Sequence, residues 1–286
     1  CPHILAEPQR TNLVTYSEVY GAGKFFSATN GSVIDNTTST SPSGENNATQ
    51  LTSTGAGKLQ TAGFSLTQNT DYAFSFYAKN VDATEVKSRV LATGGSGGSN
   101  LTSVSYISEL STTEWTRVTH IFNTGTNNTF YLYISNVLNS GGTIQLWGAQ
   151  LEVGSYATSY IPTSGSTVTR NQDQFSRDGI GSLINSTEGT LVLEPRYFIN
   201  DGSTRKIAIS DGTGTNRIYI TPYQGLASRI RYIFTNGGST QADLQVTGID
   251  ITVSRKLAFV WATNRFELWQ NGSKISEDTS GTTPSA

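Results

Sequence analysis

Short runs of alternating apolar and polar residues, separated by clusters of Gly, Asn, Asp and Ser, constrain the fold of this chain more than any other feature. In residues 71–78, for example, Tyr72, Phe74 and Phe76 fall on one face of an extended strand. A period of two indicates a half-buried strand, and turns about every eight to twelve residues are typical of a β-sandwich. The pattern therefore predicts an all-β protein.

The same signals predict strands throughout the chain. Residues 143–151 are apolar in both phases of the alternation, which is typical of a strand covered on both faces. Asn271-Gly272 lies between two such runs and predicts a tight hairpin turn, because both central residues must take positive φ. The predicted strands are 71–78, 115–122, 130–135 and 143–151 in the first half, and 189–194, 206–210, 217–221, 229–235, 257–261 and 266–269 in the second.

The composition agrees with an all-β fold rich in polar turns. Charged residues are 14% of the 286, against roughly 25% in an average domain. Ser and Thr take their place, with 34 and 41 residues respectively. The net charge of −2 excludes disorder driven by charge and gives no electrostatic footprint for nucleic acid. The chain also lacks the bulk of Ala, Glu, Lys and Leu that a coiled coil needs.

The alternation stops between residues 162 and 180, a polar stretch with no sustained period. We interpret it as a linker, or as a strap that lies on a neighbouring surface. The chain is then two consecutive antiparallel sandwiches, residues 1–161 with an N-terminal lead-in and residues 181–286. The second ends abruptly at Thr283-Pro284-Ser285-Ala286 with no obvious closing strand, so we expect it to be incomplete.

Cysteine and histidine are too sparse for several kinds of site. Cys1 alone excludes an internal disulfide and a Cys-based metal site. His3 and His120 lie far apart in the sequence, which argues against a His-rich zinc site. The chain has no run of eighteen apolar residues, so we expect no membrane-spanning helix. Because the chain has no Met, we expect it to be a piece of a longer protein.

Two segments carry a family resemblance. Leu5-Ala6-Glu7-Pro8-Gln9-Arg10-Thr11-Asn12-Leu13-Val14 and Gly148-Ala149-Gln150-Leu151-Glu152-Val153-Gly154-Ser155-Tyr156-Ala157-Thr158-Ser159-Tyr160-Ile161-Pro162-Thr163 resemble the boundaries of a carbohydrate-binding-module-like jelly roll of phage virion proteins, chiefly tail and fibre components. The second half, from Glu188-Gly189-Thr190 through Ile207–Gly212 to Leu268–Ser273, resembles a concanavalin A-like lectin/glucanase sandwich.

No catalytic pattern of the lectin/glucanase class is present. Its retaining glucanases carry two carboxylates on one strand in a Glu-x-Asp-x-x-Glu pattern, which no Glu of this chain begins. Its lyases use Arg-x-Glu-x-Arg and Gln-x-His strands, and His120 sits instead in Val-Thr-His. We therefore expect no enzymatic activity.

Candidate binding residues follow from the aromatic content and from the resemblance. Tyr131 and Tyr133, two apart on one strand face, form a possible platform for sugar rings, and Trp115 and Trp269 each adjoin a polar turn. The alternative for each aromatic residue is packing or subunit contact. Jelly-roll modules of this kind often hold a structural calcium ion, and Glu18 and Glu152 lie in the corresponding regions, so they are weak calcium candidates.

The resemblance implies a structural protein on the surface of a phage virion, with adhesion to host glycans as its task. It also implies other virion proteins as partners and a homotrimeric assembly, and we expect neither nucleic-acid binding nor membrane insertion. The alternative hypothesis is a glycan-binding region of a polysaccharide-degrading enzyme whose catalytic domain lies outside this chain. Fold resemblance by itself does not establish that either sandwich binds sugar.

Overall fold

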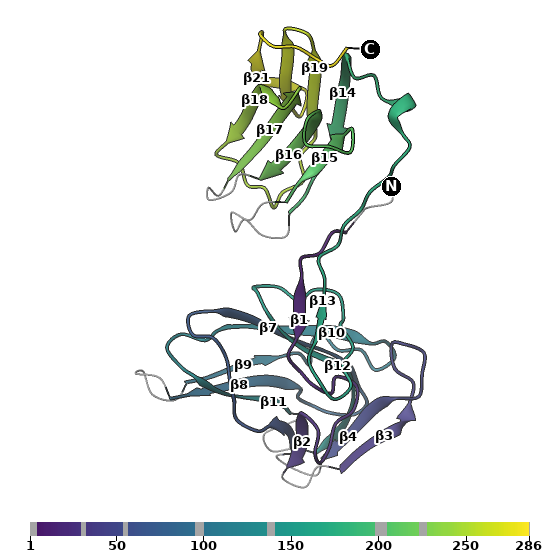
Figure 1. Cartoon of the computed structure of the whole chain (residues 1–286). Coiled ribbons are helices and arrows are strands. Elements are labelled where there is room, and N and C mark those ends of the chain that lie inside the picture. The colour runs from purple at the N-terminus through teal and green to yellow at the C-terminus, as the bar shows by residue number, and fades with distance from the viewer. Residues whose placement is uncertain are drawn as a thin grey trace. The chain divides into compact units, whose positions relative to one another are not determined.

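The computed structural model describes residues 5–29, 33–53, 57–94, 100–135, 141–197, 205–222 and 228–285. The chain divides into two compact units, Cys1–Phe175 and Ser176–Ala286, whose elements are labelled in Figure 1. The all-β prediction is confirmed: every strand pair is antiparallel, and the described residues contain a single 3-10 turn, Gly181–Leu183, besides the strands. No helix in the described ranges is long and apolar enough to cross a membrane.

The first unit contains two large sheets and one small one. The five-stranded sheet has the order β10 (Thr116–Asn123), β7 (Asp71–Asn80), β12 (Gly142–Val153), β4 (Ala48–Ser53) and β3 (Val33–Ser39). The six-stranded sheet has the order β2 (Phe26–Thr29), β5 (Lys58–Thr61), β11 (Thr129–Ser135), β8 (Lys87–Thr93) and β9 (Asn100–Ser105), with β6 (Phe64–Ser65) paired to β11. β1 (Arg10–Asn12) pairs with β13 (Val168–Arg170).

The two large sheets enclose one apolar core. The predicted alternation sets which side chains enter it: Phe74 and Phe76 of β7 and Phe130 and Leu132 of β11 are fully buried. Tyr131 of β11 is only half-buried, because it points to the other side of its sheet. Apolar burial of this kind is the main favourable term in the folding of each sandwich.

Strand β12 lies in the middle of its sheet and is buried on both faces, as its apolar pattern predicts. A register shift between Trp147 and Gln150 interrupts its pairing with β7. Gly148 sits in this bulge with a φ of 65°, a conformation that costs glycine little. After the bulge, Gln150 and Glu152 point away from the core and are covered by the N-terminal segment.

The polar stretch 162–180 is partly built into the first unit. β13 pairs with β1, Tyr16 and Ser164 form a bridge, and the amide of Asp173 donates to the carbonyl of Glu7 at 2.9 Å. Sequence periodicity gave no strand here, because β13 has only three residues and none of them is buried. The boundary between the two units falls after Phe175.

The second unit has two four-stranded sheets around its own core. One has the order β14 (Glu188–Leu193), β19 (Leu257–Ala262), β20 (Arg265–Gln270) and β21 (Ser273–Asp278). The other has the order β15 (Ile207–Ser210), β16 (Arg217–Pro222), β17 (Arg229–Asn236) and β18 (Ser239–Thr247). The predicted turn at Asn271-Gly272 is confirmed, with φ values of 49° and 84°.

Two strands of the second unit correct the sequence analysis. β21 follows the Asn271-Gly272 turn and pairs with β20, where no closing strand was predicted. It gave no signal because it is an edge strand with no buried residue. β18 was also missed, although Ala242, Leu244 and Val246 alternate in its sequence and are all buried.

Candidate functional site

The outer face of the five-stranded sheet gathers aromatic, amide and cationic side chains. The register of the strands aligns them in two rows, Arg117–Tyr77–Trp147 on β10, β7 and β12, and Lys79–Gln145–Gln50 on β7, β12 and β4. Trp115 directly precedes β10, and the Lys79 ammonium lies 5.4 Å from the centroid of its ring. Residues far apart in the sequence therefore share one surface.

Three aromatic rings pack together on this face. The Trp147 ring lies 5.6 Å from Tyr77 and 4.5 Å from Tyr160, centroid to centroid. The Arg117 guanidinium lies over the Tyr77 ring at 5.6 Å and donates to the carbonyl of Thr158 at 2.6 Å. Such contacts fix the orientation of the rings.

We call Tyr77, Lys79, Trp115, Arg117, Gln145, Trp147 and Tyr160 the aromatic face. The bulge at Gly148 shapes it, since a Cβ atom there would lie 3.1 Å from the Tyr77 ring and 3.3 Å from the Tyr160 ring. Tyr160 is held in place by its hydroxyl, which donates to Glu18 Oε1 at 3.0 Å. Burial, with a contribution from the Glu18 charge, raises the pKa of Tyr160 well above its usual range.

Four buried polar atoms at the aromatic face lack a hydrogen-bond partner within the part of the chain that the structure describes. They are Gln145 Oε1, Trp147 Nε1, Arg117 Nε and, at the rim, Asn47 Oδ1. Leaving such a group unsatisfied costs about 1–3 kcal/mol. Two of the four atoms are donors and two are acceptors, and hydroxyl groups can both accept from the former and donate to the latter. The set is suited to a ligand rich in hydroxyls.

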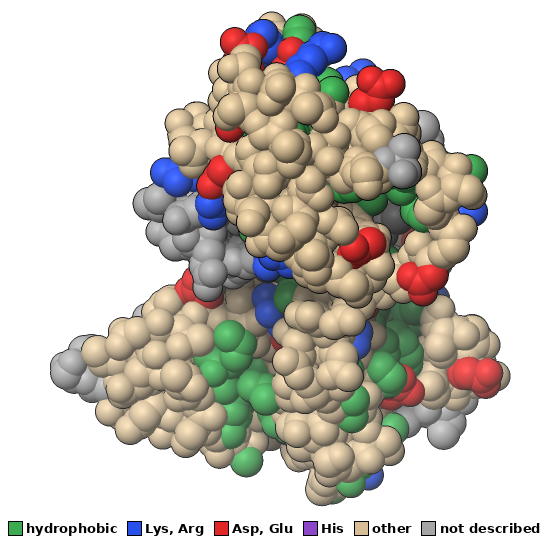
Figure 2. Space-filling model, turned by 45° about the horizontal axis from the view of Figure 1, so that its top comes forward, with side chains coloured by type: hydrophobic (Ala, Val, Ile, Leu, Met, Phe, Trp, Pro, Cys, Tyr) green, Lys and Arg blue, Asp and Glu red, His purple; other side chains and the backbone are tan. Residues whose placement is uncertain are grey.

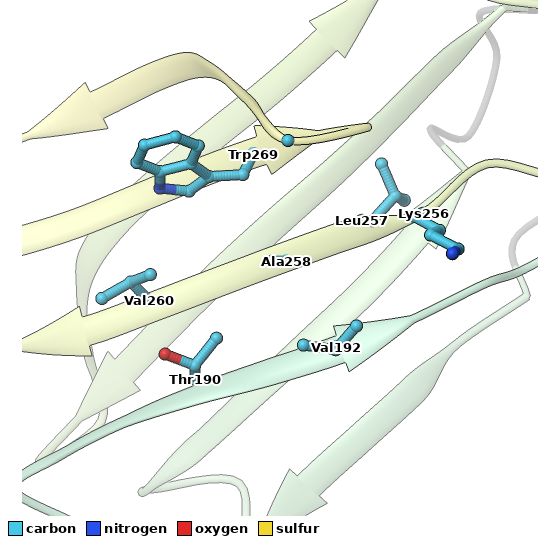
Figure 3. A pocket seen from close by; sticks show the side chains of 8 residues that line it. Thr190, Val192, Lys256, Leu257, Ala258, Val260 and Trp269 are labelled. Atoms are coloured by element: carbon cyan, nitrogen blue, oxygen red, sulfur yellow. The ribbon is translucent and has the colours of Figure 1, made fainter.

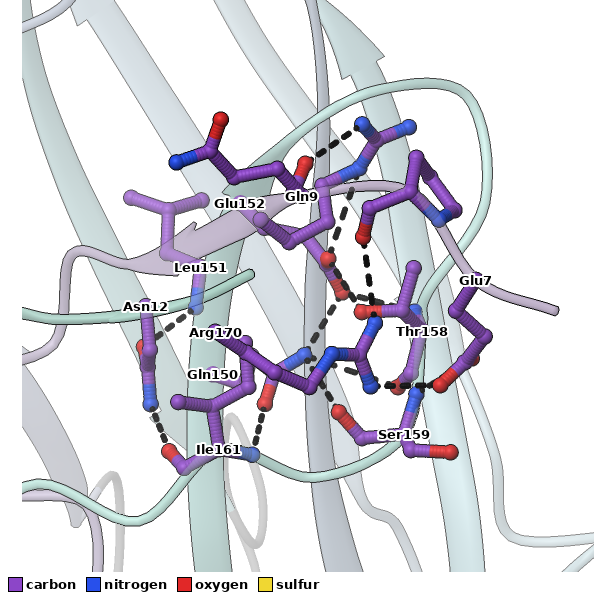
Figure 4. Close-up of polar contacts among 12 residues, drawn as sticks. Glu7, Gln9, Asn12, Gln150, Leu151, Glu152, Thr158, Ser159, Ile161 and Arg170 are labelled. Atoms are coloured by element: carbon purple, nitrogen blue, oxygen red, sulfur yellow. Dashed lines mark hydrogen bonds and ion pairs between the residues drawn. The ribbon is translucent and has the colours of Figure 1, made fainter. Parts of the chain in front are cut away.

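The opposite end of the same sheet face is covered by a polar network, drawn in Figure 4. Asn12 is its centre: its Nδ2 donates to the carbonyls of Ala149 and Ile161, and its Oδ1 accepts from the amides of Val14 and Leu151. The segments 5–14 and 148–163, which carry the jelly-roll resemblance, are the two that this network joins.

Further contacts extend the network at both sides of Asn12. Gln150 Oε1 accepts from the amide of Ile161 at 2.7 Å. Arg170 forms an ion pair with Glu7, and Arg10 Nε lies 3.7 Å from Glu152 Oε2. We call Glu7, Arg10, Asn12, Gln150, Glu152, Thr158 and Arg170 the clasp.

The two weak calcium candidates are both engaged by protein donors. Glu152 is fully buried and accepts from the Thr158 amide and hydroxyl and from Gln150 Nε2, at 2.7–2.8 Å. Glu18 accepts from Tyr160 and from Asn47 Nδ2. Among the described residues, no group of three or more His, Cys, Asp or Glu side chains is placed to hold a metal ion. A calcium ion at Glu18 or Glu152 would have to displace these donors, and it stays a prediction.

The predicted sugar-binding residues do not come together. Trp115 lies on the aromatic face, whereas Tyr131 and Tyr133 lie on the outer face of the six-stranded sheet. There the Lys58 ammonium sits 4.6 Å from the centroid of the Tyr133 ring, and the Tyr131 ring packs against Gly63, where a Cβ atom would lie 3.0 Å from it. Both rings thus already have a neighbour from their own sheet.

Trp269 belongs to the second unit. It lines a shallow hollow of about 350 Å³ on the outer face of the β14-β19-β20-β21 sheet, shown in Figure 3. Its Nε1 donates to Glu267 Oε2 at 2.8 Å, and hydrogen bonds from Arg265 and Trp269 lower the pKa of that carboxyl. Val192, Ala258 and Val260 make the lining mostly apolar, and Thr190 and Lys256 are its polar residues.

His120 lies inside the core of the first unit and not on its surface. Its Nδ1 is 2.7 Å from the Ser88 hydroxyl and its Nε2 is 3.2 Å from the Thr102 hydroxyl. Burial lowers the pKa of His120 to about 4. No carboxylate contacts the ring among the interactions of the described residues, so this geometry is that of a neutral core histidine. His3 lies outside the described residues.

Sequence reasoning found only Trp115 of the aromatic face and missed its other residues, which are Tyr77, Lys79, Arg117, Gln145, Trp147 and Tyr160. The sequence did contain a signal for Trp147. Both faces of β12 are rich in apolar residues, which indicates that its outer face is also covered. The surface drawn in Figure 2 fits the composition, since most of it is uncharged, with scattered Lys, Arg, Asp and Glu side chains.

Comparison with known proteins places one family over the first unit. The sequence model of a family described as a carbohydrate binding domain matches residues 19–139, which is less than half of the chain. This range includes Tyr77, Trp115 and Arg117, and ends before Gln145. No curated protein matches the chain.

Several solved structures resemble about half of the chain. The CBM22-1 xylan-binding domain of Paenibacillus barcinonensis Xyn10C is 16% identical, with 51% of this chain and 94% of that chain covered and a TM-score of 0.38. The C-terminal family 22 carbohydrate binding module of Clostridium thermocellum Xyn10B is 12% identical, with 51% and 97% covered and a TM-score of 0.39. A Clostridium thermocellum family 11 module, solved with a β-1,3-1,4-mixed-linked tetrasaccharide, is 13% identical, with 51% and 96% covered and a TM-score of 0.33.

Proposed function

We propose that the first unit binds carbohydrate on the aromatic face. The observation that carries the proposal is the combination of packed rings with four buried polar atoms that lack partners. Aromatic rings accept the C–H face of a pyranose, and the unpaired amide, indole and guanidinium atoms are complementary to its hydroxyls. The match of residues 19–139 to the carbohydrate binding domain family supports the same function.

In this proposal Trp147 and Tyr77 form the apolar floor, and Gln145 Oε1 and Trp147 Nε1 hydrogen-bond to the ligand. Lys79 and Arg117 add donors, and they favour sugars that present acceptors toward β7 and β10. Among the four predicted sugar-binding residues, Trp115 is the one that lies on this face. Tyr131, Tyr133 and Trp269 stay separate predictions, since each lies elsewhere.

A glycan array on the whole chain, followed by calorimetry on the hits, tests the proposal. Gln145→Leu removes the unpaired acceptor and keeps a side chain of similar size, so we expect it to weaken binding by about tenfold or more. Tyr131→Ala, on the opposite sheet, is the matched control and leaves the affinity unchanged. Binding that survives Gln145→Leu but not Tyr131→Ala contradicts the proposal and assigns the site to the tyrosines.

We further propose that the chain is a non-catalytic structural component of a phage virion, displayed on a tail, a fibre or the particle surface. The resemblance of residues 5–14 and 148–163 to virion jelly rolls supports this role, and adhesion to host glycans is its task. A homotrimer and contacts with other virion proteins belong to the same proposal. A monodisperse monomer in light scattering, with no affinity for particle proteins, contradicts it.

The alternative is a glycan-binding region of a polysaccharide-degrading enzyme, with its catalytic domain outside this chain. The description of the matching family favours this alternative as much as a virion role. The sequence that flanks this chain in its gene decides between them. A hydrolase or lyase domain supports the enzyme, and a shaft or particle-anchoring region supports the virion.

A further inference from the structure

A hydrogen bond connects the segments that flank the two edge strands of the five-stranded sheet. Trp115 directly precedes β10, which is one edge strand, and Thr40 directly follows β3, which is the other. Trp115 Nε1 donates to the carbonyl of Thr40 at 3.1 Å. Strand spacing would keep these edges about 19 Å apart in a flat sheet, farther than a side chain can span. Trp115 and Thr40 lie just outside their strands, so the bond requires these two flanking segments to approach each other over the outer face, where the Trp115 ring lies near Lys79.

Residues of the inner strands lie between these two flanking segments. The register places Lys79 and Gln145 on the strands between Trp115 and β3, in the row that continues from Trp115. Gln145 Nε2 reaches Ser39 Oγ at 2.8 Å, beside Thr40 in the chain. Gln145 Oε1 and Trp147 Nε1, on the same sheet face, are buried without a hydrogen-bond partner among the described residues. A ligand can reach these two atoms only if something above them moves.

We propose that Trp115 is the cover of the aromatic face and determines which ligands enter it. The Trp115–Thr40 bond holds the face closed, and ligand binding breaks it. The freed indole then packs on the bound sugar, while a sugar hydroxyl replaces the indole as donor to the Thr40 carbonyl. This inference rests on the proposed carbohydrate binding and adds the residue that controls access to the site.

The energetics suit a reversible cover. One neutral hydrogen bond contributes only a small net stabilisation, so the open state is within thermal reach. The unpaired atoms of Gln145 and Trp147 shift the equilibrium toward the open state when a ligand is present, because a ligand that bonds to them stabilises the open, occupied state. Such a ligand must present a donor and an acceptor close together, as the adjacent hydroxyls of a sugar do. Apparent affinity is then reduced by the fraction of molecules that are closed.

The first test needs no sugar. Trp115→Phe keeps the ring and removes the donor, so we expect the indole proton of Trp147 to exchange with solvent about two- to tenfold faster in NMR experiments on the full chain. Trp269→Phe is the matched control, because it removes an indole hydrogen bond in the second unit and leaves Trp147 exchange unchanged. Equal exchange in the two variants overturns the proposal.

The second test uses the best glycan from the array. Trp115→Phe raises the association rate constant about two- to tenfold if the bond is a closing contact. An unchanged rate, or a loss of binding, overturns the cover and makes Trp115 either a bystander or a direct hydrogen-bond donor to sugar. If no glycan binds the unaltered chain, the proposed function fails, and the exchange experiment still decides whether Trp115 covers Trp147.

Discussion

On the outer face of the five-stranded sheet, strands β7 and β12 pass through both the clasp and the aromatic face. Both regions bury polar side chains, but they differ in how completely these side chains are hydrogen-bonded. In the clasp, Asn12, Gln150 and Glu152 have their side-chain oxygens and amide groups matched to protein partners. The Nε atoms of Arg10 and Arg170 have no hydrogen bond among the described residues, but each of the two side chains forms an ion pair.

In the aromatic face, Gln145 and Trp147 retain unpaired atoms, and no ion pair of the described residues compensates for them. Buried polar groups are nearly always satisfied in folded proteins, so satisfied groups indicate structure and unsatisfied ones need another explanation. The difference supports the proposal that the clasp closes the sandwich and that the aromatic face binds a ligand. The predictions below, in order of decreasing effect, test this division.

Removing the centre of the clasp has the largest expected effect. Asn12→Leu deletes four hydrogen bonds and leaves backbone groups of Ala149, Ile161 and Leu151 unpaired in a buried site. We expect the free energy of unfolding to fall by about 3–4 kcal/mol, measured by urea denaturation. A loss below about 1 kcal/mol contradicts a structural role for the clasp.

The second prediction concerns the loss of folding stability at low pH, which depends on His120 in the core beneath both regions. His120 has a usual pKa of 6.5, and its pKa in the folded chain is about 4. Between these values the unfolded chain binds a proton that the folded chain does not, so stability is complete above pH 6.5 and falls as the pH drops toward 4. The loss is at most about 3 kcal/mol.

Urea denaturation at pH 7 and at pH 4.5 measures this loss, and His120→Gln should reduce it. Asn12→Leu is the control, because it lowers stability at both pH values without changing the difference between them. If His120→Gln leaves the difference intact, the acid sensitivity does not come from His120.

The bulge that separates the two regions gives an intermediate effect. Gly148→Ala places a Cβ atom close to the Tyr77 and Tyr160 rings at a φ of 65°. We expect a loss of about 1–3 kcal/mol in the free energy of unfolding, because both backbone strain and ring displacement contribute. Near-ultraviolet circular dichroism reports the displaced rings. Gly125→Ala, also at positive φ but with open space around it, should show the strain without the change in the aromatic signal.

The aromatic face gives the smallest stability effect. Gln145→Leu loses the bond to Ser39 Oγ but also removes the unpaired Oε1, so we expect the free energy of unfolding to change by less than about 1 kcal/mol. Thermal and urea denaturation measure it. A loss as large as that of Asn12→Leu means that Gln145 belongs to the structure and removes the contrast between the two regions.

Sequence patterns predicted only some of the strands that have a buried apolar face, since β4, β8 and β18 have one and were missed. β7, β11 and β19 were found by their alternation, and β12 by its apolar residues in both phases. β13 and β21 were missed because they are short or solvent-exposed edge strands without an apolar period. Edge strands are held by backbone hydrogen bonds, which leave no mark in the side-chain pattern.

The sequence by itself determined an all-β chain, the residues of β7 and β11 that share the core face, and Trp115 as a candidate for sugar contact. Only the tertiary structure decided that Trp115 lies with Tyr77, Trp147 and Tyr160, while Tyr131, Tyr133 and Trp269 lie elsewhere. The physical reason is that alternation fixes which way a side chain points but not which strand is its neighbour. Neighbours depend on strand order and register, and these bring Thr40, Lys79, Trp115 and Gln145 together from four separate parts of the chain.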